Sequence, residues 1–133
     1  MTSVVVRHAA AGDREQWDGD DFHRPLNAKG RRQAVELAEL LRPLGVRRVV
    51  SSPYVRCVET VKPLAAALAL PLECDERLAE GAGPGAIELL REDGVVCCTH
   101  GDIAEELLGR HLKKGAAVVL SGVEVVREIP PPK

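Results

Sequence analysis

Arg7 and His8 are the first residues whose types could carry out chemistry, because they directly follow an apolar segment. The preceding run, Val4-Val5-Val6, is β-branched and predicts a strand buried on both faces. In open α/β sheets, ligands gather at the carboxyl ends of the strands. A guanidinium at that place can bind a phosphate, and an imidazole beside it can attack the phosphorus. This strand end is therefore a candidate anion site.

Two further strand ends carry matching groups. The apolar segment 46–51 predicts a second strand, and Arg56 follows one helical turn beyond it. The segment 95–99 predicts another strand, which leads directly to His100. Parallel strands end at the same edge of a sheet, so two guanidiniums, two imidazoles and several helix N-termini would surround one anion. The sequence therefore predicts a phosphate-binding site formed by Arg7, His8, Arg56 and His100.

The order of elements that must position these residues indicates the fold class. Helices are expected from Asn27, a side-chain cap, to about Pro43, from Tyr54 to Leu68 with a kink or restart at Pro63, over 86–92, and from a cap at Asp102 to about Leu112. Strands are expected at 4–8, 46–51, 71–75, 95–99, 116–120 and 123–129. This alternation predicts a three-layer α/β/α sandwich with a mostly parallel sheet and one antiparallel strand from the terminal hairpin.

Length and composition place the chain among soluble globular proteins. Its 133 residues fit a single domain over 1–129, with a frayed tail at Pro130–Lys133. The net charge of −2 argues against a general nucleic-acid binder, which would cluster Lys and Arg. No apolar run approaches the ~20 residues needed to span a bilayer, and the first strand begins too early for a signal peptide. We therefore expect a cytoplasmic protein that binds neither membrane nor nucleic acid.

The cysteines and isolated polar residues have simpler interpretations. Four cysteines lack a paired C-x-x-C spacing, which favours reduced, buried thiols over a disulfide framework. Cys98 and His100 share a strand face, but a structural zinc site needs four ligands and no other pair supports one. Trp17 and His23 lie in a long loop over 9–26 that would cover the first strand end. They could contact a substrate there, or they could simply be exposed to solvent.

Three motifs in this order resemble those of the histidine phosphatase superfamily, with its phosphoglycerate-mutase-like fold. They are Val4-Val5-Val6-Arg7-His8, then Ser51-Ser52-Pro53-x-x-Arg56 with Thr60, and Thr99-His100-Gly101. The small size, the Arg-His-Ala start and the segment Arg24-Pro25-Leu26-Asn27-x-x-Gly30 are most similar to the small branch of SixA-like phosphohistidine phosphatases. The resemblance covers nearly the whole chain.

The resemblance implies a phosphatase that needs neither metal nor cofactor. His8 would accept the phosphoryl group as the nucleophile, and its other ring nitrogen would donate to a backbone carbonyl of the nearby loop. Arg7, Arg56 and His100 would bind the phosphoryl oxygens and stabilise the transition state. Glu80 stands where many members carry a general acid, although as an isolated residue it would be a surface carboxylate.

The sequence leaves the substrate open. Ala9 replaces the glycine that is common after the catalytic histidine, and the family's large substrate-covering insertions are missing. The resulting open cleft favours a phosphorylated protein, so the leading hypothesis is a protein phosphohistidine phosphatase. The alternatives are a phosphomonoesterase for a small ester such as a sugar phosphate or nucleotide, and a phosphate-binding regulatory module without turnover.

Overall fold

Six strands form one sheet in the order β3-β2-β4-β1-β5-β6 in the computed structural model, which describes residues 2–133. The strands are β1 (Thr2–Arg7), β2 (Arg48–Ser51), β3 (Leu72–Cys74), β4 (Val95–Thr99), β5 (Ala117–Ser121) and β6 (Glu124–Ile129). β1, β2, β3 and β4 pair in parallel, whereas β5 runs antiparallel to both β1 and β6. The predicted mostly parallel sheet with one antiparallel strand is confirmed.

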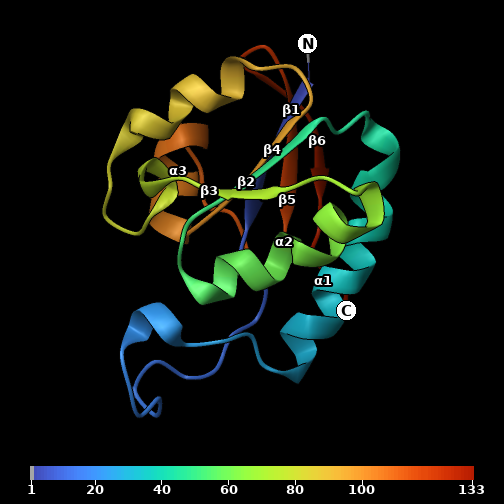
Figure 1. Ribbon diagram of the computed structural model, residues 1–133. Coiled ribbons are helices and arrows are strands. Elements are labelled where there is room, and N and C mark those ends of the chain that lie inside the picture. The colour runs from blue at the N-terminus through green and yellow to red at the C-terminus, as the bar shows by residue number, and fades with distance from the viewer. Residues whose placement is uncertain (1) are drawn as a thin grey trace.

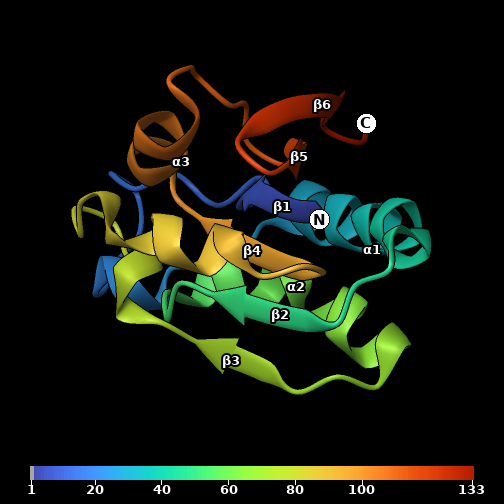
Figure 2. The same cartoon turned by 90° about the horizontal axis from the view of Figure 1, so that it is seen from above.

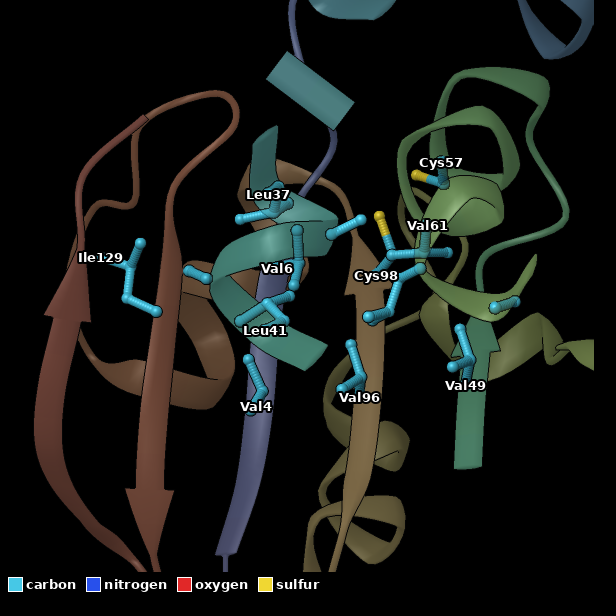
Figure 3. Close-up of a cluster of buried hydrophobic side chains, with 14 of the residues drawn as sticks. Val4, Val6, Leu37, Leu41, Val49, Cys57, Val61, Val96, Cys98 and Ile129 are labelled. Atoms are coloured by element: carbon cyan, nitrogen blue, oxygen red, sulfur yellow. The ribbon is translucent and has the colours of Figure 1, made fainter. Parts of the chain in front are cut away.

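Helices cover both faces of this sheet (Figures 1 and 2). On one face lie α1 (Ala28–Leu41) and α2 (Val55–Leu68), and on the other lie α3 (Gly101–Leu108) and the 3-10 segment η4 (Pro84–Arg91). Alternate residues of β1 face opposite layers, so Val4 and Val6 pack with α1 and α2 while Val5 packs with η4 and α3. Figure 3 shows the first of these cores, with Leu37 and Leu41 of α1 among its members. The three-layer α/β/α architecture is as predicted.

Two predictions concerned the layer formed by α1 and α2. The Asn27 cap is confirmed, because its side chain accepts a hydrogen bond of 2.8 Å from the Gly30 N–H. The predicted alternative of a restart at Pro63 is wrong, because α2 continues through it from Val55 to Leu68. Val61 and Leu64 are buried on either side of the proline, and their packing holds the helix together across the missing hydrogen bond.

On the other layer, the helix after β4 differs from the prediction. It ends at Leu108 instead of Leu112, because Gly109 adopts φ 70° and closes it in the left-handed conformation. The predicted Asp102 cap is wrong, since His100 occupies the cap position. The Asp102 carboxylate instead accepts a hydrogen bond of 2.8 Å from the Gly81 N–H in another loop.

The chain's last residues and its cysteines also differ in part from expectation. The tail was expected to fray, yet Pro132 is buried and its carbonyl accepts a hydrogen bond of 2.9 Å from Gln33 of α1. All four cysteines are free thiols; Cys74 is exposed and the other three are buried. Within residues 2–133, the helices are all too short or too polar to cross a bilayer.

Other connections tie α1 to the loop after β1, which Figure 1 shows extending beyond the end of the sheet. Gln33 accepts a hydrogen bond of 3.0 Å from the Ala10 N–H, and the Asn27 N–H donates to the Ala10 carbonyl at 3.1 Å. Gly30 lies against the same residue, because a Cβ added there would be only 1.9 Å from the Ala10 oxygen. Residue 30 must therefore lack a side chain for the loop to keep its path.

Substituting Gly30→Ala should destabilise the protein by roughly 1–3 kcal/mol, as expected for a side chain that displaces closely packed backbone. Chemical denaturation measures the effect. The matched control is Gly12→Ala, where the new Cβ meets no atom within 4 Å. Equal stability of the two variants would contradict this account of the α1 contact.

Candidate active site

A cleft of about 650 Å³ opens at the carboxyl end of β1, where the sequence predicted an anion site. Its walls come from the loop after β1, the loop after β3, the start of α3 and the residues before β5. The charged or titratable residues that line it are Arg7, His8, Asp13, Arg14, Glu15, Arg24, Glu80, Asp102 and Lys114. Arg56 and His100 are buried beneath the cleft surface, where Arg56 contacts Glu80 and the His100 ring lies against that of His8. All five candidate site residues are thus brought together.

His8 is held as a neutral imidazole with one nitrogen available. Its Nδ1 lies 2.8 Å from the Ala9 carbonyl oxygen and therefore donates, which leaves the lone pair on Nε2. Burial lowers the pKa of His8 to about 3, and the nearby positive charges act in the same direction, while the Ala9 hydrogen bond opposes them. Near neutral pH this side chain is in the form that can attack phosphorus. The expected backbone acceptor is the carbonyl of the next residue.

Arg7 is fixed beside His8 by backbone groups. Its Nη1 donates a hydrogen bond of 2.9 Å to the Leu112 carbonyl. The guanidinium lies against Gly101, where an added Cβ would be only 2.8 Å from Cζ. Burial lowers the pKa of Arg7, and the Asp102 carboxylate partly reverses this. Its buried Nε has no hydrogen-bond partner within residues 2–133, so this donor is unsatisfied in the protein alone.

Arg56 is fully buried and is neutralised by acidic groups from two loops. Asp21 accepts a hydrogen bond of 2.9 Å from Nη1 through its carbonyl and forms an ion pair of 3.2 Å with Nη2 through Oδ2. Glu80 contacts the same Nη2 at 3.5 Å. The centre of the Tyr54 ring lies 4.9 Å from the guanidinium carbon, and Nε has no hydrogen-bond partner in the described part of the chain. The arginine therefore has both a counter-charge and an unused donor.

His100 connects the two halves of the site. Its Nε2 lies 2.8 Å from the Ser52 hydroxyl, and its Nδ1 lies 3.5 Å from Nη2 of Arg56. Its ring centroid is 5.6 Å from that of His8, with the planes at 65°. The two imidazoles, which come from the ends of adjacent strands β1 and β4, therefore lie edge to face beside each other.

Thr60 fixes the position of the backbone next to His8. Its hydroxyl accepts a hydrogen bond of 2.9 Å from the Ala9 N–H and donates one of 2.7 Å to the Arg56 carbonyl. The hydroxyl thus donates one and accepts one hydrogen bond inside the protein. Thr60 joins the loop after β1 to α2, and so sets the spacing between the nucleophile and the buried arginine.

Glu80 lies in the cleft, where its carboxylate accepts a hydrogen bond of 2.9 Å from Nη2 of Arg14. Arg14 also lies 3.5 Å from Asp21, which in turn bonds Nε of Arg24 at 2.8 Å. This network holds the long loop over the strand ends, as expected for that loop.

Sequence reasoning did not identify Asp21, Arg14, Arg24 or Lys114 as site residues. The motif quoted for the resemblance includes Arg24, but nothing in its spacing indicates that its side chain is buried and bonded to the Gly12 carbonyl. Trp17 and His23 do not line the cleft, and both are exposed. Within residues 2–133 there is no cluster of three His, Cys, Asp or Glu residues suited to a metal ion.

Comparisons with known proteins agree with the motifs. The family model of the histidine phosphatase superfamily (branch 1) matches residues 3–84. The chain is 35% identical over 116 residues, 80% of its length, to the 8-oxo-(d)GTP phosphatase of Mycolicibacterium smegmatis. It spans only 36% of that relative.

Two solved structures share the fold across 98% of the chain. SixA from Agrobacterium tumefaciens superposes with a TM-score of 0.79 at 19% identity, over 98% of its own length. The protein histidine phosphatase SixA complexed with tungstate superposes with a TM-score of 0.78 at 22% identity, over 97% of its length. The family match, the shared fold and the strand-end arginines and histidines lead to one conclusion: this chain belongs to the histidine phosphatase superfamily, branch 1.

Proposed function

We propose that the chain is a phosphatase that transfers a phosphoryl group to Nε2 of His8 and then to water, without a metal ion. The observation that carries this proposal is the neutral His8, with its lone pair on Nε2, between two guanidiniums that each keep a buried, unpartnered Nε. A nucleophile beside unused cationic donors matches what phosphoryl transfer requires, namely positioning and charge stabilisation.

In the first step, Nε2 of His8 forms a bond to phosphorus while the bond to the leaving group breaks. The proton stays on Nδ1 and continues to hydrogen-bond to the Ala9 carbonyl, which stabilises the positive charge on the phosphorylated ring. Arg7, Arg56 and His100 hold the equatorial oxygens, whose charge grows in the transition state. Water then attacks the phosphorus, the P–N bond breaks, and orthophosphate and neutral His8 are released.

The leaving group determines the role of Glu80. An alkoxide needs a proton as it departs, whereas a leaving imidazole depends less strongly on protonation. Glu80 lines the cleft and contacts Nη2 of Arg56, where phosphoryl oxygens would bind. A bound phosphoryl group would take the place of this carboxylate at Arg56. We infer that the displaced Glu80 carboxylate, which lines the open cleft, takes up a proton from solvent and donates it to the leaving group.

Two substrate classes fit this site. A phosphohistidine on a protein is supported by the open cleft and by the fold shared with SixA. A small phosphate ester is supported by the 35% identity to a relative named for a nucleotide substrate. A panel of phosphohistidine protein, sugar phosphates and nucleotides separates the two classes by kcat/KM.

Removing the nucleophile should abolish turnover. The variant His8→Ala should lose at least about a thousandfold in kcat on an aryl phosphate, as expected when a nucleophile is deleted. Wild-type activity should persist in excess chelator. The phosphorylated His8 should be trapped by an alkaline quench, because phosphohistidine is hydrolysed in acid. Tight orthophosphate or vanadate binding without hydrolysis would instead identify a non-catalytic binding module.

The charge state of His8 gives a second test, by NMR titration of its ring protons. In the folded protein the ring should remain neutral down to pH values well below 6.5, whereas in denaturant it should titrate near ~6.5. Below pH ~6.5 the unfolded chain then binds a proton that the folded chain does not, so the free energy of unfolding should fall as the pH drops from 6.5 toward 3. The variant His8→Gln should lose less stability over that range. A folded-state titration at the ordinary value would contradict the burial argument.

Glu80→Gln should have an effect that depends on the leaving group. With an alkyl phosphate we expect kcat to fall by roughly 10²- to 10⁴-fold, the range for a lost general acid. With a phosphorylated imidazole the loss should be much smaller. The control is Glu15→Gln, another carboxylate that lines the cleft. Equal losses for both leaving groups would exclude Glu80 as the proton donor.

A further inference from the structure

Lys114 lines the same cleft as His8 although the two residues are far apart in sequence. The adjacent Gly115 N–H lies 3.1 Å from the Arg7 carbonyl and 3.0 Å from the His8 carbonyl. Gly115 has φ 82°, and an added Cβ would meet the buried Gln33 side chain at 3.3 Å. The backbone that carries Lys114 is therefore fixed directly to the end of β1.

Lys114 differs from the other cations of this cleft in its partners. Arg14 is paired with Glu80, Arg24 is paired with Asp21, and Arg7 donates to the Leu112 carbonyl. Within residues 2–133 Lys114 makes no ion pair with a carboxylate. Its ammonium group is thus a cation of the cleft that no protein carboxylate neutralises in the described part of the chain.

The surroundings of Lys114 favour an anion. Lys114 is an exposed residue, and its partial burial against the cleft lowers its pKa, as do positive neighbours, of which Arg7 has the largest influence. An anion placed between these groups would relieve the repulsion. The loop after β1 offers an anion a less favourable place, because it contributes the carboxylates of Asp13 and Glu15 as well as Arg14 and Arg24 to the cleft. A second negative group on the substrate is therefore accommodated at Lys114.

We propose that Lys114 forms a second anion subsite, which binds a phosphate joined to the phosphoryl group that His8 receives. This inference rests on the proposed function and names its substrate class, a phosphoanhydride such as a nucleoside diphosphate or triphosphate. Nε2 of His8 bonds to the terminal phosphorus and the bridging P–O bond breaks. The departing phosphate keeps the electron pair, and the ammonium group of Lys114 stabilises its charge.

Binding of methylenediphosphonate, a diphosphate mimic that cannot be hydrolysed, tests the subsite by calorimetry. Lys114→Met should weaken its binding about tenfold, the usual loss for one charged contact to a phosphate, and should change orthophosphate binding less than about twofold. Lys114→Arg should retain most of the affinity for the diphosphonate. The matched control is Lys113→Met, because that neighbour lines a different pocket beside His111 and Glu128.

Equal weakening of both ligands, or no change for either, would overturn the inference, and so would an equal loss in Lys113→Met. Thermal unfolding of each variant checks that it is folded, and Lys114→Gln provides a second neutral variant. Because calorimetry needs no turnover, the subsite is tested separately from catalysis. If the wild-type protein hydrolysed no phosphate substrate, the proposed function would be contradicted. A diphosphonate affinity that depends on Lys114 would still support the subsite.

Discussion

The buried guanidinium of Arg56 imposes the main constraint on this active site. A charge with no solvent exposure is costly unless nearby groups compensate it, and the scaffold of α2 and the central strands supplies no carboxylate for this purpose. The compensation comes from Asp21 and Glu80, which belong to two different loops. The same arginine therefore joins the loops that form the cleft walls, and in the proposed mechanism phosphate affinity and loop structure depend on one side chain.

The position of β1 determines how the remaining groups are delivered. It lies between β4 and β5, so its carboxyl end is flanked by His100 from a parallel neighbour and by Lys114 before an antiparallel one. The loop that follows β1 is then fixed to α1 through Gln33 and Gly30. Because each of these contacts is made by backbone or by buried groups, His8 is oriented by rigid parts of the fold.

The sequence could predict the features that depend on local pattern. Strands β1 and β4, the Asn27 cap, and the convergence of Arg7, His8, Arg56 and His100 follow from apolar periodicity and the rule that parallel strands end together. It could not predict contacts between loops. Asp102 has the residue type of a helix cap, but its carboxylate bonds to the Gly81 N–H, a partner that only the folded chain brings near. The position of Lys114 in the cleft could not be predicted for the same reason, since it depends on the pairing of β1 with β5.

The mixture of charges in the cleft has a consequence for turnover. A site lined only by cations would hold the orthophosphate product tightly, and slow product release limits kcat. Here Asp21 and Glu80 already occupy Nη2 of Arg56, so an arriving phosphoryl group must displace carboxylates, which weakens ground-state and product binding. Near the Lys114 side the described chain offers no such competitor. In the proposed mechanism, affinity is thus moderated at the phosphoryl group that reacts and kept for the part of the substrate that Lys114 binds.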